Sequence, residues 1–469
     1  MNVRLSLCMI VRNEAEELPR CLQSVQGLVD ELVVVDTGSQ DGTVDVARRY
    51  GALIREIPWQ NDFAAARNVA LSLASGEWIL WLDADEELLP ESRECLPSLL
   101  SAGDTEGYFI QLHNLLGSRA DPETEVALLF RLWRNRPEYR FVGTVHEQIL
   151  PAIRSVNPQA KVAHSPLQVM HYGYLREHVA AKGKENRNLA LLEEGLRAQP
   201  NDPFLRFNLG IEHFVQRRFP QARDAFERSL DRVHSDALWR PRLVKGYAAT
   251  LCELARWDEA FAFLGVERRR YPDYTDLTYV AGVAHSVLGH HEAAISVFRA
   301  CLERGPAPCP PYTAVDREAG GCKAHLALGK EYEAIGRYPD ALQEYASAAM
   351  AKPRWGEALR CLATLMSKRV DDETMLRVLQ AFFPDATDAD QIKIAALLAY
   401  TGRYQLALER LSPLDAAGRL DRGGRYTLAL CLTKLGRSAD ALTILGEDWA
   451  GSPLEGQVKA LARSLTSEA

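Results

Sequence analysis

The sequence predicts two kinds of fold in one chain: an α/β domain with a mostly parallel sheet, followed by an all-α solenoid of helical repeats. Apolar β-branched runs alternate with amphipathic stretches over about the first hundred residues, as in βαβ units. After residue 200 a fixed spacing of small residues recurs in Ala- and Leu-rich segments. With 469 residues the chain is also too long for a single hydrophobic core.

The first domain should begin with alternating strands and helices. We expect strands at residues 5–11, 31–36, 52–56 and 78–82, helices at 16–25, 43–50 and 63–74, and further strand-like segments at 107–112 and 128–133. The continuous Leu-Val-Val-Val run within 31–36 implies burial on both faces of the sheet. The predicted domain limits are 1–175 for the α/β domain, 176–200 for a connecting helix, and 201–469 for the repeats.

The helical part carries an internal repeat. Ala260 and Ala294 are 34 positions apart, and so are Ala407 and Ala441. A glycine precedes the repeat's alanine by five positions, where a helix must end and the chain reverse, at Gly289, Gly336, Gly402 and Gly436. The period is that of tetratricopeptide repeats. An unrelated helical bundle is the alternative, and the fixed spacing argues against it.

Charge and cysteine usage narrow the class of protein. The net charge is −8, and residues 1–175 hold 15 Lys and Arg against 24 Asp and Glu. No basic stripe is present, so a nucleic-acid partner is not expected. Nine cysteines are scattered without a paired motif, which is typical of a reducing compartment. No apolar stretch is long enough for a membrane span, and no secretory signal is evident. We therefore expect a cytoplasmic chain.

Two carboxylates follow the fourth predicted strand directly, at Asp83 and Asp85. Carboxylates that alternate around a small residue at a strand end can bind a divalent cation, which in turn can bridge the phosphates of a nucleotide. Ligands of open α/β sheets bind at that edge. The alternative interpretation is a solvated acidic turn that caps a helix at residues 86–89.

Four segments in order carry a family resemblance. They are residues 8–14 (CMIVRNE), 34–43 (VVDTGSQDGT), 61–68 (NDFAAARN) and 81–85 (WLDAD). Together they resemble the catalytic domain of glycosyltransferase family 2, which has the GT-A fold. The resemblance covers about residues 3–90 closely and 105–175 loosely. It implies a UDP-sugar donor and a Mn²⁺ or Mg²⁺ cofactor.

The resemblance also implies roles on the nucleotide side. Val11, Asn13 and Glu14 would line the nucleotide pocket, and Asp36 would accept a hydrogen bond from the uracil N–H. Asp36 could equally begin a turn, and Asp41 is better interpreted as part of a turn before a helix.

Further roles follow at the reacting end of the donor. Asp83 would face the ribose and Asp85 would bind the metal. Arg67 and Asn68 begin a helix beside the expected diphosphate, where a guanidinium can bind a phosphate or form an ion pair with Asp83.

Two later segments complete the candidate site. Glu147 matches the position of the family's acidic base, which takes the proton of the attacking acceptor. A His-Glu pair stands where family members often have an Asp. His171 is a candidate metal ligand, and His164 competes with it for that role. A histidine packed among tyrosines is the structural alternative for His171.

The expected function is inverting transfer of a hexose or N-acetylhexosamine from a UDP-sugar. The combination with helical repeats resembles peptide S- or O-glycosyltransferases of the sublancin-modifying kind, so the acceptor is expected to be a Cys, Ser or Thr side chain. A saccharide or lipid-linked acceptor in envelope biosynthesis and a non-catalytic scaffold are alternatives. A nucleotidyltransferase is disfavoured, because residues 11–16 are not a Gly-rich basic loop. Whether the repeats form a homodimer stays open.

Overall fold

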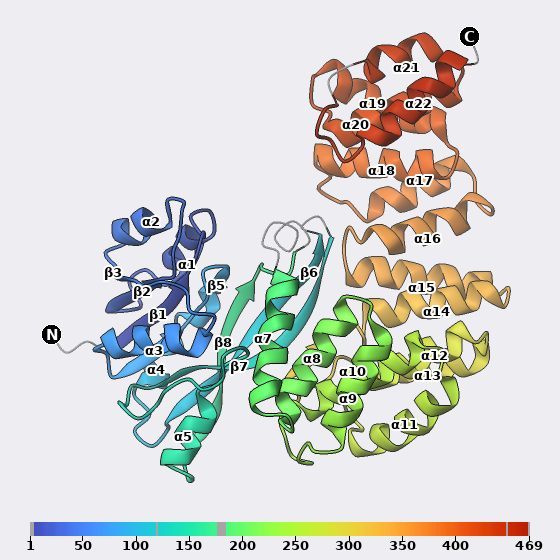
Figure 1. Cartoon of the computed structure of the whole chain (residues 1–469). Helices are drawn as coiled ribbons and strands as arrows, with labels where there is room; N and C mark the ends of the chain where they lie inside the picture. Colours follow the sequence, from blue (N-terminus) through green and yellow to red (C-terminus); the bar gives the residue numbers. More distant parts are fainter. Residues whose placement is uncertain (1–3, 119–120, 176–183, 447–448, 468–469) are drawn as a thin grey trace. The chain divides into compact units, whose positions relative to one another are not determined.

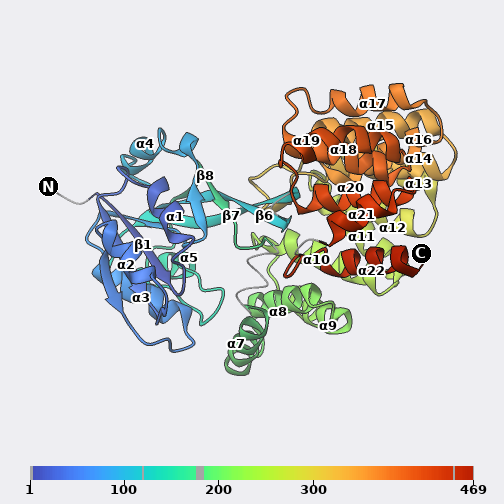
Figure 2. The same cartoon turned by 90° about the horizontal axis from the view of Figure 1, so that it is seen from above.

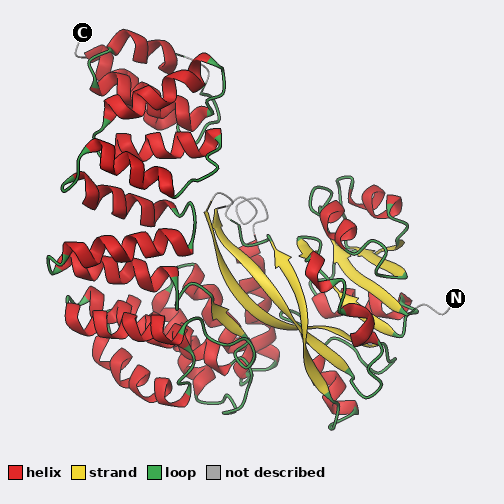
Figure 3. Ribbon diagram, turned by 180° about the vertical axis from the view of Figure 1, so that it is seen from behind, coloured by secondary structure: helices red, strands yellow, loops and turns green. Residues whose placement is uncertain are grey.

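The computed structural model describes residues 4–118, 121–175, 184–446 and 449–467 (Figure 1). The chain divides into two compact units, residues 1–320 and 321–469. Every strand that the structure describes lies in the first unit (Figure 3). The first unit thus contains the whole α/β domain together with the first helical repeats. The predicted limits at 175 and 201 mark a change of fold within this unit and stay a prediction, and residues 176–183 of the connecting segment lie outside the described residues.

One mixed sheet organises the α/β domain. Its strands are β1 (Leu5–Val11), β2 (Glu31–Asp36), β3 (Leu53–Glu56), β4 (Trp78–Trp81), β5 (Glu86–Leu88), β6 (Gly107–Ser118), β7 (Asp121–Arg134), β8 (Val162–His171) and β9 (Ala314–Asp316). The strand order is β3-β2-β1-β4-β7-β6-β8-β5, and β9 pairs with β7. Strands β3, β2, β1 and β4 run parallel, so their carboxyl ends meet at one edge.

The parallel strands are buried on both faces because the two faces pack against different cores. In β4, Trp78 and Leu80 belong to one core cluster, whereas Ile79 and Trp81 belong to the other. This alternation explains why the strand is apolar at every position, as was predicted for the Val-rich run in β2. Helices cover both faces: α1 (Leu18–Ser24), α2 (Thr43–Arg49), α3 (Phe63–Leu73), α4 (Leu96–Leu100) and α5 (Leu150–Val156). A short 3₁₀ helix, η1 (Pro90–Ser92), precedes α4.

Most predicted elements of this domain are confirmed within one or two residues. The candidate helix at residues 86–89 is wrong, because residues 86–88 form β5 and pair with β8. The strand-like segments at 107–112 and 128–133 are parts of the longer strands β6 and β7, which form a ribbon well beyond both predictions.

The helical repeats of the first unit follow directly on this sheet. They are α7 (Lys184–Ala198), α8 (Pro203–Val215), α9 (Phe219–Leu230), α10 (Arg240–Glu253), α11 (Trp257–Arg270), α12 (Thr275–Val287) and α13 (His291–Arg304). After α13 the chain returns to the sheet, where β9 adds to the edge of β7. Val126 of β7 and Val315 of β9 share a core cluster with residues of α10, α11 and α12. The repeats and the sheet of this unit therefore share buried apolar surface.

The second unit is entirely helical in its described residues. Its helices are α14 (Cys322–Ala334), α15 (Tyr338–Ala351), α16 (Gly356–Ser367), α17 (Asp372–Ala381), α18 (Asp388–Tyr400), α19 (Tyr404–Ala416), α20 (Arg422–Lys434), α21 (Ser438–Leu445) and α22 (Glu455–Ser467). Helices adjacent in the chain pack on each other, for example α14 on α15 and α18 on α19, and α16 also contacts α18 (Figure 2). Among the helices that the structure describes, none combines the length and the apolar composition needed to cross a bilayer.

The repeat pattern has a simple packing cause. The glycines predicted at the helix ends have positive φ, for example 70° at Gly289 and 75° at Gly436. The alanines five positions later are fully buried. In three repeats a second glycine, Gly210, Gly282 or Gly329, lies under an aromatic ring: a Cβ atom at Gly282 would stand 2.5 Å from the ring of Phe298. Small residues thus let the two helices of a repeat approach closely.

Candidate active site

The candidate site lies where the parallel strands β1, β2 and β4 end. Val11 and Asp36 are paired in register at the ends of β1 and β2, and Asp83 follows β4 on the other side of β1. The carboxyl edge predicted from the sequence is therefore where these residues meet.

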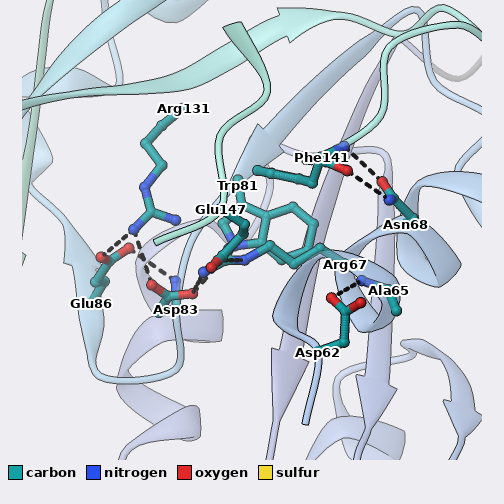
Figure 4. Close-up of polar contacts among 10 residues, drawn as sticks. All are labelled: Asp62, Ala65, Arg67, Asn68, Trp81, Asp83, Glu86, Arg131, Phe141 and Glu147. Atoms are coloured by element: carbon teal, nitrogen blue, oxygen red, sulfur yellow. Dashed lines mark hydrogen bonds and ion pairs between the residues drawn. The ribbon is translucent and has the colours of Figure 1, made fainter. Parts of the chain in front are cut away.

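An acidic network with two arginines occupies the end of β4 (Figure 4). The Arg67 guanidinium lies between two carboxylates: its Nη2 atom is 3.3 Å from Asp83 Oδ1, and its Nε atom forms an ion pair with Glu147. Arg131 donates from Nη2 to Asp83 Oδ2 at 2.9 Å and to Glu86 Oε1 at 3.1 Å. Two guanidinium groups thus link three carboxylates.

The surroundings shift the pKa values of Asp83 and Glu86 in opposite directions. Burial alone would raise the pKa of Asp83, but the guanidinium groups of Arg131 and Arg67 outweigh it and lower that pKa to about 2. Glu86 is almost completely buried, and burial raises its pKa to about 7 despite the attraction of Arg131. Asp83 is therefore an anion at neutral pH, whereas Glu86 holds a proton more readily than an ordinary glutamate.

Arg67 is buried in an aromatic environment. Its guanidinium carbon lies 4.4 Å from the centre of the Trp81 ring. Trp81 Nε1 in turn donates to Asp83 Oδ1 at 3.2 Å. Arg67 Nη1 is buried and has no hydrogen-bond partner among the described residues. A buried guanidinium nitrogen without a partner is uncommon in folded proteins and needs an explanation.

Asp85 and His171 are brought together by strand pairing. Glu86 of β5 is the register partner of His171 of β8, so the preceding Asp85 reaches the same end of β8. His171 Nε2 is 3.5 Å from Asp85 Oδ1, and its Nδ1 atom is 2.8 Å from Oδ1 of the buried Asn114. An amide oxygen accepts only, so Nδ1 carries a proton, and in the neutral ring Nε2 is the nitrogen with the lone pair.

Gly173 has no side chain and so does not fill the region that Asp85 and His171 face. A Cβ atom at Gly173 would stand 2.5 Å from Asp85 Oδ2 and 2.6 Å from His171 Nε2. Any side chain at position 173 would therefore fill the volume that both polar atoms face. Carboxylate oxygen and neutral imidazole nitrogen are both ligands of Mn²⁺-like cations. Among the described residues, no group of three or more His, Cys, Asp and Glu is arranged to hold a metal.

His164 does not share this location. It lies seven residues before His171 on β8, roughly 20 Å away at the rise of an extended strand. Its ring stacks on Phe109, with 5.3 Å between ring centres. Of the two histidine candidates, only His171 lies beside Asp85.

The segments after β1 and β2 are tied to each other. Asn13 adopts a positive φ of 55°, its backbone N–H donates to Ser39 Oγ at 2.9 Å, and its Oδ1 accepts from Gln40 N at 2.8 Å. Asp36 Oδ1 accepts from the backbone of Gly38 and Ser39, at 2.9 Å each, and its Oδ2 accepts from the Ser39 hydroxyl.

The remaining candidates on this side differ in what they can offer a ligand. The Val11 side chain is buried in the core, and its carbonyl accepts from Thr37 N at 3.0 Å. Glu14 donates its backbone N–H to Thr43 Oγ1 at 2.8 Å. Asp41 closes the turn before α2 by accepting from Thr43 N at 3.0 Å, as its sequence context predicted.

Asn68 holds a backbone segment instead of facing the acidic network. Its amide donates to the Phe141 carbonyl at 3.0 Å and accepts from the Phe141 N–H at 2.8 Å (Figure 4). This pair of hydrogen bonds uses both ends of the side-chain amide. Asn68 thereby fixes the segment that leads to Glu147.

Sequence reasoning missed Glu86, Arg131, Asn114 and Gly173. Arg131 was visible only as a charge within an apolar strand, and Glu86 as a third acid after the alternating pair. Asn114 and Gly173 carry no local signal, because their importance depends on the pairing of β8 with β5 and β6.

The geometry defines an α/β domain with an acidic, arginine-linked ligand site at the ends of its parallel strands. Residues 6–137 match the family model for glycosyl transferase family 2. The matched residues thus carry the glycosyl transferase family 2 domain, and the helices from α7 onward follow it.

The names of the relatives give one or the other of these descriptions. A TPR repeat-containing protein of Synechococcus elongatus is 41% identical over 211 residues, which cover 44% of this chain and 51% of the relative. The SPbeta prophage-derived glycosyltransferase SunS of Bacillus subtilis is 29% identical over 226 residues, covering 47% and 52%. An uncharacterized glycosyltransferase of Rickettsia felis is 32% identical over 148 residues, covering 30% and 52%. The chain spans about half the length of these curated relatives.

Solved structures match this chain with lower sequence identity. A tetratricopeptide repeat protein of Parabacteroides merdae is 15% identical with a TM-score of 0.34, covering 55% of this chain and 95% of its own. The TarS structure of S. aureus is 14% identical with a TM-score of 0.31, covering 55% and 54%.

Proposed function

We propose that this chain is a metal-dependent, inverting glycosyltransferase that moves a hexose or N-acetylhexosamine from a UDP-sugar to a Cys, Ser or Thr side chain of a peptide or protein. The observation that carries the proposal is the space at Gly173, which Asp85 Oδ2 and His171 Nε2 both face, at the ligand-binding edge of a family 2 domain.

Asp85 and His171 would hold a Mn²⁺ or Mg²⁺ ion. Two protein ligands are few, which suits a cation whose remaining positions are filled by the donor's diphosphate and by water. Such an ion would offset the negative charge of the departing nucleoside diphosphate. The contact between His171 Nδ1 and Asn114 would fix the ring so that Nε2 could bind the ion.

The donor's other parts would meet residues already placed by the fold. Asp83, an anion beside Arg67, would bind the ribose hydroxyls, and the Arg67 guanidinium would interact with the diphosphate. Asp36 accepts three hydrogen bonds from its own turn, and a carboxylate has about four acceptor positions, so one remains for the uracil N–H. Asn13 and Glu14 lie on the adjoining segment.

Glu147 is the proposed general base. In a single displacement, the acceptor's sulfur or oxygen forms a bond to the anomeric carbon while the bond from that carbon to the phosphate oxygen breaks. The acceptor's proton passes to the Glu147 carboxylate, and the pair of bonding electrons leaves with the diphosphate. The ion pair with Arg67 holds the carboxylate in one position and links it to Asp83.

The helical repeats support a peptide or protein acceptor. Stacked helical hairpins present extended concave surfaces on which peptides bind. A saccharide or lipid-linked acceptor would leave the repeats with another role, and a test with both acceptor classes separates the two.

A ligand panel tests the donor and the metal together. UDP, UDP-glucose and UDP-N-acetylglucosamine, each with and without MnCl₂, should raise the melting temperature of the full chain only where nucleotide and metal are both present. Asp85→Ala should abolish this dependence and the release of UDP from the sugar. Glu91→Ala removes one exposed acid nearby and serves as the matched control. Undiminished UDP release by Asp85→Ala would overturn the metal role, and a chain that no nucleotide stabilises would favour the scaffold alternative.

A further inference from the structure

The segment that carries the proposed base, residues 141–147 (here the Glu147 loop), has few anchors of its own. Val142, Gly143, Thr144 and His146 are exposed, and only Phe141 and Val145 are buried before Glu147 is reached. Two residues adopt positive φ, 95° at Gly143 and 50° at His146. A loop with this backbone needs external contacts to keep one conformation.

The first anchor belongs to the α/β domain. Asn68 holds the backbone of Phe141 by two hydrogen bonds, and the Phe141 ring packs edge-on against Trp81 with 5.2 Å between centres. At the other end, Val142 and Gln148 exchange two backbone hydrogen bonds of 2.9 Å, which close the loop.

The second anchor comes from the helical repeats. Val145 is 4% exposed and forms a core cluster with Leu191 and Leu192 of α7 and Leu205 of α8. Phe63, the first residue of α3, packs against the same cluster, and its N–H donates to the Thr144 carbonyl at 3.0 Å. All of these residues lie in the first compact unit.

We propose that α7 and α8 are part of the catalytic apparatus, because they hold Val145 and thereby position Glu147 two residues further along. The inference rests on the proposed function, in which Glu147 is the base. Val145, Leu191, Leu192 and Leu205 are positioning residues: they touch neither donor nor acceptor and act through the Glu147 loop. The first helical hairpin of the repeats therefore serves the chemistry of the α/β domain, and a change in this hairpin changes the rate of transfer.

A looser Glu147 loop should lower the rate because catalysis by a general base depends on precise geometry. General base catalysis requires the carboxylate within hydrogen-bond distance of the proton that it takes, and a displacement of about 1 Å can cost about 100-fold in rate. Shortening Val145 or Leu192 leaves a cavity under the loop and lets it move. Donor binding is expected to be spared, because Asp85 directly precedes β5 and His171 ends β8, outside this cluster.

The test compares four variants of the full chain by UDP release from a UDP-sugar with MnCl₂. Val145→Ala and Leu192→Ala should lower kcat by roughly 10- to 100-fold while KM for the UDP-sugar changes less than about twofold. Val145→Ile keeps an apolar side chain under the loop and should leave kcat close to the wild-type value. The matched control is Leu251→Ala, a buried leucine of α10 in a different core cluster. Unchanged kcat in both test variants, or an equal fall in the control, would overturn the inference.

A second measurement does not depend on turnover. Amide hydrogen exchange at Val142 and Gln148, whose N–H groups close the loop, should accelerate in Leu192→Ala and stay unchanged in Leu251→Ala. Equal exchange in the two variants would show that α7 does not hold the loop. If the loop loosens as expected but the wild-type chain turns over no UDP-sugar, the positioning stands and the proposed function fails.

Discussion

Two regions of the first unit bury arginines against carboxylates, and they do so differently. In the repeats, Arg240 of α10 donates two hydrogen bonds of 2.8 Å to the two oxygens of Glu267 and a third, also 2.8 Å, to the hydroxyl of Tyr271. Arg240 and Glu267 form a bidentate pair, and the half-exposed Arg270 lies 3.8 Å from the same glutamate. In the acidic network, Arg67 and Arg131 serve three carboxylates, and Asp85 stands beside them.

The difference separates a structural ion pair from a site made for a ligand. A buried ion pair with balanced charge and satisfied donors has no polar atom left to bind a ligand, so its role is structural. The acidic network carries surplus negative charge, a glutamate with a raised pKa and an unpartnered guanidinium nitrogen. Such features are costly in a folded protein without a ligand, and a cation with a diphosphate would satisfy both signs at once.

The sharpest way to break this comparison is to remove the central arginine of each region. Arg67→Ala should lower UDP release by at least about 100-fold, because Asp83 and Glu147 lose their common partner and the diphosphate loses a donor. Steady-state kinetics on the full chain measure this. Arg240→Ala deletes the same charge from a buried pair in the same unit, and its kcat per folded molecule should match the wild type. Equal loss of turnover in both variants would erase the distinction.

The second prediction concerns stability. Arg240→Ala leaves Glu267 buried without its partner and should cost about 3–5 kcal/mol of unfolding free energy. Urea unfolding of the full chain, followed by fluorescence, measures the loss. Replacing the pair together, Arg240→Met with Glu267→Leu, should recover most of it, because neither charge is then stranded. A double variant as unstable as the single one would mean that the pair does more than balance charge.

A third prediction uses pH in the second unit. Asp390 accepts from Arg354 Nε at 2.6 Å and Nη2 at 2.9 Å, and from Thr387 in the capping box of α18. Its hydrogen bond with Arg354 holds the pKa of Asp390 below its usual value, although burial opposes this. The stabilisation is therefore present above the unfolded-state pKa, about 3.9, and is lost as pH falls below it.

The Asp390→Asn variant isolates that contribution. It should lower stability by about 1 kcal/mol at pH 7, the typical worth of a helix cap, and by less at pH 3, where part of the contribution of ionised Asp390 is already lost. Thermal unfolding of both proteins at the two pH values gives the comparison. A deficit that is the same at pH 3 and pH 7 would contradict an ionised Asp390 as its source.

The sequence predicts the position of a site residue where that position depends on local sequence, and not where it depends on distant strand pairing. Asp83, Asp85 and Asp36 follow apolar strands, so their common edge could be inferred from parallel pairing alone. His171 lies opposite Glu86 only because β8 pairs with β5, a strand of three residues without sequence signal. Asn68 was expected at the ligand and instead holds Phe141, since its partner is a backbone group 73 positions away. The helical period was readable because each repeat packs on a neighbour with the same spacing.

The smallest effect should come from ion pairs in water. Arg48 and Asp45 on α2 are 2.8 Å apart, yet their side chains are 65% and 78% exposed. Solvent screens their attraction, and holding two long side chains together costs entropy, so Arg48→Gln should change the unfolding free energy by less than about 0.5 kcal/mol. Urea unfolding at low and at high salt measures it. A larger change would mean that distance alone decides the worth of an ion pair here. The different roles of Arg240 and Arg67 would then reflect the N–O distances of their ion pairs. The structure instead supports burial and charge balance as the causes.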